Sequence, residues 1–211
     1  MVEIYIAGSG GFAQEVFWYI RQMEHKFVVK GFVDQPRDEK LPSEYCGVPI
    51  FNELDFDYTG RNVVVGTGYP RLREKIVNYI NTHFDFVDFP NIISPAATIT
   101  STQTLRIGHG VIIASGCVVT NDVTLDGFVN LNMNTTIGHN SILCAFATTA
   151  TNVSVSGNVT IGRRVHLGNN SCVKERCLVG NDIIVGMGGV VTKNLYVPGT
   201  YIGCPARKVG I

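Results

Sequence analysis

The stretch TIGHNSILCAFATTATNVSVSGNVTIGRRVHLGNN (136–170) carries an aliphatic residue at every sixth position except Thr149, and this period extends over residues 107–192. Counting in steps of six from Ile107 to Val191 gives fifteen positions, of which fourteen are aliphatic and one is Thr149. A second series, four residues after each of these, is mostly small or β-branched. Neither a helical period of 3.6 nor a strand period of two explains a strict six.

A short strand followed by a turn does produce a six-residue period. We expect three such units to close one coil, so that fifteen units build five coils of a parallel β-helix. A β-sandwich with chance periodicity is the alternative, but it would not hold register through fifteen units. Glycine often follows the aliphatic position, as at Gly108, Gly138, Gly162 and Gly168. We interpret these glycines as sources of backbone flexibility at tight corners.

Composition excludes several classes of partner. Lys plus Arg equals Asp plus Glu at 17 each, so no net field attracts the chain to nucleic acid or to a membrane surface. Only 16% of residues are charged and 45% are hydrophobic, which favours an oligomer. The residues from Met1 to Ala7 are too short for a signal peptide, and no apolar run approaches the roughly 20 residues of a membrane span. We therefore expect a cytoplasmic protein with no span.

The N-terminal part has the order of a βαβ unit. A predicted strand over residues 2–7 leads into a glycine-rich loop and a helix, and a second strand from Phe27 closes on Asp34. The loop fits the dinucleotide fingerprint, with Ala13 in place of its third glycine and Asp34 at the position of the ribose-binding acid. Such a loop binds nucleotides, nucleotide sugars or dinucleotides, or is a simple tight turn. The lack of a second mononucleotide half disfavours a dinucleotide.

The rest of this part is less regular. We expect residues 35–60 to be irregular, followed by a strand over 62–65, a helix from Pro70 and a short strand over 84–89. The helix should have its polar side at Arg71, Arg73 and Lys75 and its inward side at Leu72, Ile76 and Ile80. We place the domain boundary after residue 90, giving domains 1–90 and 91–211.

Two regions of the sequence resemble known proteins. The hexads resemble the left-handed β-helix of hexapeptide-repeat acyltransferases, and the tail YIGCPARK (201–208) is similar to the ending common in that superfamily. IAGSGGF (6–12) and GFVD (31–34) are similar to bacterial sugar acetyltransferases, a group that includes sialic acid O-acetyltransferases and N-acetyltransferases of nucleotide-linked 4-amino-4,6-dideoxy sugars. The resemblance implies a small Rossmann-like domain for the nucleotide sugar, a left-handed β-helix for acetyl-CoA, and a homotrimer with active sites between subunits.

The same resemblance implies the site residues. His139 occupies the place of the catalytic histidine, and an imidazole suits removal of a proton during acyl transfer. Gly157 matches a glycine whose N–H faces the thioester oxygen. Asn140 replaces an acid found in some members, and Thr148 replaces a second histidine near acetyl-CoA.

Matching to the family also implies two groups of binding residues. The acceptor is expected to be bound by Gly10, Gly11, Phe12, Asp34 and Gly66. Acetyl-CoA is expected to contact Thr148, Gly157, Asn169, Met187, Gly188, Arg207 and Lys208. No metal is expected, because His109, His139 and His166 are not separated by multiples of the 18-residue coil and do not stack.

The sequence thus predicts an acetyl-CoA-dependent N-acetyltransferase acting on a nucleotide-linked amino sugar in bacterial glycan biosynthesis. O-acetylation of a sialic acid or a related sugar is the alternative within enzymes. An alternative of another class is a β-helix that binds a ligand or serves as a scaffold without catalysing a reaction.

Overall fold

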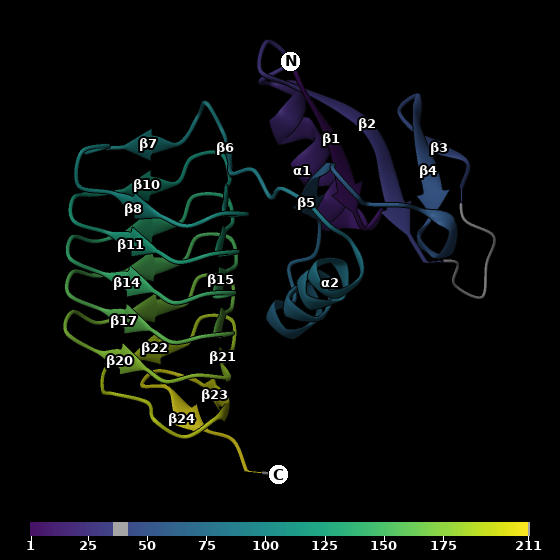
Figure 1. The fold of residues 1–211 in the computed structure, drawn as a ribbon. Helices are drawn as coiled ribbons and strands as arrows, with labels where there is room; N and C mark the ends of the chain where they lie inside the picture. The colour runs from purple at the N-terminus through teal and green to yellow at the C-terminus, as the bar shows by residue number, and fades with distance from the viewer. Residues whose placement is uncertain (36–41, 211) are drawn as a thin grey trace. The chain divides into compact units, whose positions relative to one another are not determined.

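The computed structural model describes residues 1–35 and 42–210 and divides into two compact units, Met1–Pro95 (unit 1) and Ala96–Ile211 (unit 2). Figure 1 shows unit 1 in purple and blue and unit 2 as a stack of coils from teal to yellow. The division falls after Pro95, a little beyond the boundary that the sequence placed after residue 90.

Unit 1 is Rossmann-like. Its sheet has the strand order β3-β4-β2-β1-β5, in which β4, β2, β1 and β5 are parallel and β3 pairs antiparallel with β4. The elements are β1 (Val2–Ala7), α1 (Gly11–Arg21), β2 (Phe27–Asp34), β3 (Glu44–Tyr45), β4 (Val48–Asn52), the 3-10 turn η1 (Glu53–Asp55), β5 (Asn62–Val65), α2 (Pro70–His83) and β6 (Ile92–Ile93).

Helix α1 packs through the face that the sequence predicts. Val16, Phe17 and Ile20 are all almost fully buried. The helix also lies unusually close to β5, because a Cβ on Gly66 would come within 2.6 Å of the Ala13 Cβ. Only glycine fits at such a distance, so Gly66 is required for helix–strand packing.

Two local predictions in unit 1 are wrong. The predicted irregular segment 35–60 contains β4 and η1, while its residues 36–41 lie outside the described part of the chain. Residues 84–89 form no strand and contribute only an isolated bridge from Asp88 to Asn62. Phe86 interrupts this run because it adopts a φ of 57° and is 90% exposed. A left-handed residue cannot continue an extended strand.

The burial of α2 also differs from its predicted pattern. Arg73, which was assigned to the polar side, is 1% exposed, and Leu72, which was assigned to the core, is 47% exposed. Arg73 Nη1 donates a hydrogen bond to the carbonyl oxygen of Thr67, in the loop after β5, at 2.9 Å. Burial lowers the pKa of Arg73 to about 9. A buried carbonyl needs a donor, and apolar periodicity does not reveal this need.

Unit 2 is a left-handed parallel β-helix, as predicted. Its three sheets stack in the orders β22-β19-β16-β13-β10-β7, β20-β17-β14-β11-β8 and, within this unit, β24-β23-β21-β18-β15-β12-β9. All neighbours are parallel except β23 and β24. The strands are β7 (Thr98–Ile99), β8 (Arg106–Ile107), β9 (Ile112–Ile113), β10 (Val118–Val119), β11 (Thr124–Leu125), β12 (Asn130–Leu131), β13 (Thr136–Ile137), β14 (Ile142–Leu143), β15 (Thr148–Thr149), β16 (Ser154–Val155), β17 (Thr160–Ile161), β18 (His166–Leu167), β19 (Cys172–Val173), β20 (Leu178–Val179), β21 (Ile183–Val185), β22 (Val190–Val191), β23 (Gly199–Ile202) and β24 (Arg207–Lys208).

The corners between strands depend on left-handed residues. The position three residues after each aliphatic position has a φ between 56° and 73° in every unit from Gly110 to Gly188. L-residues with a Cβ avoid this region, and Gly, Asn and Asp tolerate it best. Those three types fill most of the positions, which are Gly110, Gly116, Asp122, Phe128, Asn134, Asn140, Phe146, Asn152, Asn158, Arg164, Asn170, Arg176, Asp182 and Gly188.

The glycines after the aliphatic positions have a different role from the predicted one. Gly108 and Gly138 do not have a positive φ, so they supply no unusual backbone conformation. A Cβ on Gly108 would instead lie 2.5 Å from the backbone nitrogen of Gly127, and one on Gly138 would lie 2.6 Å from that of Gly157. These glycines are needed because the neighbouring coil leaves no room for a side chain.

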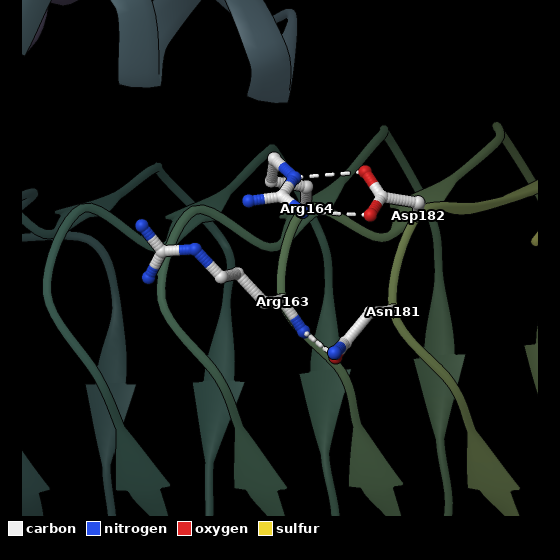
Figure 2. Close-up of polar contacts among 4 residues, drawn as sticks. All are labelled: Arg163, Arg164, Asn181 and Asp182. Atoms are coloured by element: carbon white, nitrogen blue, oxygen red, sulfur yellow. Dashed lines mark hydrogen bonds and ion pairs between the residues drawn. The ribbon is translucent and has the colours of Figure 1, made fainter.

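One corner carries bulky residues at the left-handed positions. Phe128 and Phe146 stack on each other, with ring centroids 5.1 Å apart and an interplanar angle of 5°. In the next coil Arg164 makes a two-pronged ion pair with Asp182, at 2.8 Å and 2.7 Å (Figure 2). Arg163 lies beside it and places its guanidinium over the Phe146 ring, 4.8 Å from the centroid. Stacking and ion pairing between coils therefore stabilise a corner that has Phe or Arg at three of its left-handed positions.

We predict that Asn152→Val destabilises the protein, whereas Asn152→Gly is close to neutral. Asn152 is exposed and has a φ of 60°, so the substitution mainly changes the cost of the left-handed backbone. That cost is about 1–2 kcal/mol for a residue with a Cβ and highest for a branched one. Urea unfolding at fixed protein concentration measures the difference. Equal stability of the two variants would contradict the role given to this position.

Candidate active site

The corner that contains His139 provides the first part of the site. His139 follows Gly138 at the end of β13 and precedes the left-handed residue Asn140. The His139 carbonyl accepts a hydrogen bond from the Asn158 N–H of the next coil at 2.8 Å. The backbone of the histidine is thus fixed by the coil stack while its side chain extends from the corner.

Asn140 orients the imidazole ring. Its side-chain oxygen Oδ1 lies 2.8 Å from His139 Nδ1. A carbonyl oxygen only accepts, so this hydrogen bond places a proton on Nδ1, and in the neutral ring Nε2 then keeps its lone pair. The sequence showed that Asn140 brings no negative charge. The structure shows that Asn140 still sets the tautomer that a general base needs.

Gly157 forms the surface on which the ring rests. A Cβ on Gly157 would lie 2.7 Å from His139 Nε2 and 2.8 Å from Cε1, so the absence of a side chain leaves room for the imidazole. Within the described part of the chain, the Gly157 N–H has no hydrogen-bond partner. An unpaired N–H beside the free nitrogen of an imidazole is suited to stabilise negative charge on a bound carbonyl.

Ser141 fixes the Gly157 turn, a role that the sequence analysis missed. Its side chain is fully buried, and Oγ donates to the Ser156 carbonyl at 3.0 Å and accepts from the Val159 N–H at 3.1 Å. These two bonds clamp both sides of Gly157. The only signal in the sequence is a hydroxyl residue at an inward position, where an unsatisfied hydroxyl would be costly.

The other histidines of unit 2 lie elsewhere. His109 occupies the equivalent position of a different corner, over Gly127 and edge-on to Phe128, with ring centroids 4.9 Å apart. His166 lies on strand β18. The three imidazoles therefore do not converge.

Of the predicted acetyl-CoA residues, Gly157 lies against His139, and the others do not gather around this histidine within one chain. Asn169, Met187 and Gly188 lie together on another corner, where the Gly188 N–H donates to the Asn169 carbonyl at 2.8 Å. Met187 is 76% exposed there. Thr148 lies in β15 and is 1% exposed. The remaining two predicted residues, Arg207 and Lys208, form the exposed strand β24.

In unit 1 the loop after β1 is held by Asp34. The Asp34 carboxylate accepts hydrogen bonds from the Ser9 N–H at 2.7 Å and from Ser9 Oγ at 2.6 Å. The next residues, Gly10 and Gly11, open helix α1 and have free space where a Cβ would be. Phe12 follows them in the helix and is half-buried. The open helix N-terminus offers backbone N–H groups to an anion.

A cavity of about 290 Å³ lies at this end of unit 1. Its lining includes polar and charged residues from the strand ends together with apolar residues of α2, among them Gly8, Asp34, Glu53, Lys75, Ile76 and Tyr79. The carboxyl ends of parallel strands are the usual ligand site in open α/β sheets. Asp34 lines this cavity, and Gly66 packs against Ala13 of α1. Their contacts with an acceptor stay predictions.

No helix within residues 1–35 and 42–210 is long and apolar enough to cross a membrane.

Comparison with known proteins identifies similar molecules. Residues 3–80 match the PglD N-terminal domain family. A histidine-to-asparagine variant of perosamine N-acetyltransferase from Caulobacter crescentus, solved with CoA and GDP-perosamine, is 26% identical, with a TM-score of 0.86 over 99% of this chain and 97% of that one. No curated protein sequence matches the chain.

Two further solved structures share the fold. The acetyltransferase domain of PglB from Neisseria gonorrhoeae is 23% identical, with a TM-score of 0.84 over 98% of this chain and 99% of that one. WeeI from Acinetobacter baumannii is 23% identical, with a TM-score of 0.85 over 99% and 100%. Both of these structures therefore have the folds of unit 1 and of unit 2 in one chain.

We predict that neutral His139 carries its proton on Nδ1. Nitrogen-15 NMR of the ring distinguishes the two tautomers, and Asn140→Ala should shift the population toward a proton on Nε2, because the accepting oxygen is lost. His109 is the internal control and should not change. A ring with its proton on Nε2 in the unmodified protein would contradict the orientation assigned to Asn140.

Proposed function

We propose that this chain, which belongs to the hexapeptide-repeat superfamily of bacterial sugar acetyltransferases, transfers an acetyl group from acetyl-CoA to the amino group of a nucleotide-linked 4-amino-4,6-dideoxy sugar. The observation that carries the proposal is the arrangement of His139, Asn140 and Gly157, which presents a free imidazole nitrogen next to an unpaired N–H. Full-length similarity to an N-acetyltransferase solved with CoA and a nucleotide sugar supports this acceptor class.

The residues divide the chemistry between them. Acetyl-CoA supplies an acyl carbonyl that is activated by its thioester. His139 Nε2 accepts a proton from the attacking amine, and Asn140 keeps the ring in the tautomer that permits this. The Gly157 N–H is placed to stabilise the negative charge that develops on the carbonyl oxygen. The acceptor is assigned to unit 1, with Asp34 and the loop Gly8–Gly11 on its nucleotide.

The separation of His139 from Asn169, Met187 and Gly188 supports a shared site. Because these groups lie on different corners of one β-helix, a second copy is needed to bring the proposed acetyl-CoA residues to the proposed base. Exposed apolar side chains on unit 2, such as Ile142 at 42% and Leu178 at 36%, offer surface for self-association. A homotrimer is therefore part of the proposal. Glycan biosynthesis and a cytoplasmic location stay predictions.

Thiol release from acetyl-CoA, measured with a panel of amino-sugar nucleotides and free sialic acids, tests the proposal. We predict that His139→Asn lowers kcat by about 10²–10⁴-fold, the usual effect of removing a positioned base, with little change in KM. Transfer only to hydroxyl acceptors would favour the O-acetyltransferase alternative. Absence of thiol release with every acceptor would favour the alternative that the chain is a scaffold.

Two glycine variants of equal size serve as a matched pair in that assay. Gly157→Ala should lower kcat at least tenfold, because its Cβ would displace the His139 ring and occupy the space beside the free N–H. Gly127→Ala places the same methyl group under His109, where the closest ring atom is 3.4 Å away, and should keep near-normal activity. A kcat above a tenth of the unmodified value for both His139→Asn and Gly157→Ala would place the base elsewhere.

Mixed assemblies test the shared site. His139→Ala and Met187→Glu should each be nearly inactive alone, since one removes the base and the other puts a charge on the exposed acetyl-CoA corner. When the two chains assemble together at random, about a quarter of the sites combine two unmodified residues, and activity should return to about that fraction. Light scattering measures the oligomeric state in parallel. A 23 kDa monomer, or mixed chains without recovery, would contradict the shared site.

A further inference from the structure

We infer that the acceptor site of unit 1 recognises a guanine nucleotide, with the Glu53 carboxylate accepting hydrogen bonds from N1–H and the 2-amino group of the base. This inference rests on the proposed function for the class of ligand and deepens it by naming the base. It is carried by the order of the strand ends, the lining of the cavity and the hydrogen-bonding pattern of the bases.

The strand order gives a direction to the bound nucleotide. At the carboxyl ends of the parallel strands, β1 leads into the open N-terminus of α1, β2 ends at Asp34, and β4 lies on the far side of β2. An anion at the helix N-terminus and a ribose at the acid after β2 are the usual placement in this fold. A nucleotide that follows this direction places its base beyond β2, at the end of β4.

Glu53 is the residue at that place. Asp34 pairs with Asn52 across β2 and β4, and Glu53 comes directly after Asn52 at the start of η1. Glu53 therefore lies one residue beyond the partner of Asp34 at the same edge of the sheet. Both line the same cavity, together with Ile76 and Tyr79 from α2, which provide an apolar wall for a planar ring.

The two carboxylates differ in how much of their accepting capacity is used. Asp34 accepts from the Ser9 N–H, from Ser9 Oγ and from the Gln35 N–H at 2.8 Å. No donor among the described residues bonds to the Glu53 carboxylate, although Glu53 is one of the residues that line the cavity. Both oxygens of Glu53 are thus open to a ligand.

Tyr58 gives independent support for the position of these acids. Its hydroxyl is buried and has no hydrogen-bond partner within residues 1–35 and 42–210. Burial raises the pKa of Tyr58, and the negative charges of Glu53 and Asp34 raise this pKa further. The Tyr58 hydroxyl therefore lies close enough to both carboxylates for their charges to affect its pKa.

Among the common bases, guanine fits a carboxylate with two free oxygens best. Its Watson–Crick edge presents two neighbouring donors, N1–H and the 2-amino group, which match the two oxygens in parallel. Uracil and thymine present one N–H between two carbonyl oxygens, so the second carboxylate oxygen would face an acceptor. Adenine and cytosine present one amino group next to a bare ring nitrogen.

Calorimetric binding to the full chain without acetyl-CoA tests the inference. GDP should bind at least about tenfold more tightly than UDP, dTDP or ADP. Inosine diphosphate lacks only the 2-amino group, and its affinity should be about tenfold lower than that of GDP, which is the usual effect of losing a charge-assisted hydrogen bond. Glu53→Gln should weaken the binding of GDP by a similar factor. The same variant should gain affinity for xanthosine diphosphate, because its amide donates to the carbonyl that replaces the amino group.

Asp55→Asn is the matched control. Asp55 is an exposed acid on the same turn, bonds to Asn52 and is not in the cavity lining, so the selectivity of this variant should be unchanged. UDP or dTDP binding as tightly as GDP would overturn the inference. An equal loss of affinity for every nucleotide in the Glu53→Gln variant would also overturn it. Failure of the proposed function looks different, because thiol release would then be absent with all acceptors while selectivity for GDP persisted.

Discussion

The structure of unit 2 depends on how closely its coils stack. Strands of successive coils pair in parallel at about 4.8 Å, and the corners must follow at the same spacing. This spacing leaves no room for a side chain at Gly108 and Gly138, and each corner needs one residue in the left-handed region. A single geometric constraint therefore sets the left-handed position in each repeat and requires glycine after the aliphatic position in some of them.

The candidate catalytic group is a product of the same constraint. Asn140 occupies its position because an asparagine tolerates the left-handed backbone, and from there its side-chain oxygen reaches His139 Nδ1. Gly157 lies one coil further along the same corner and accommodates the imidazole face. A corner built for tight stacking thus also orients a base and leaves an N–H beside it. The site needs no additional loop or insertion.

Much of unit 2 was predictable because its constraint is periodic. The six-residue step located the strands, and the inward positions are buried as expected. The reason for the glycines was not predictable, because a sequence does not distinguish a glycine needed for φ from one needed for space. Ser141 was missed for a related reason, since its two hydrogen bonds cross between coils that are adjacent only in the folded chain.

Unit 1 shows where local patterns stop being informative. The helical period of apolar residues predicts α1 correctly because that helix buries one apolar face. Helix α2 instead buries Arg73, which donates to the Thr67 carbonyl, and exposes Leu72 to the cavity. Strand β4 was missed because it is a short strand inside a segment rich in proline and acids. Yet this strand carries Glu53 to the edge where Asp34 lies. The part of unit 1 that was hardest to predict is thus the part that adds a second acid to the cavity, because positions that line a cavity do not carry the apolar pattern that a core imposes.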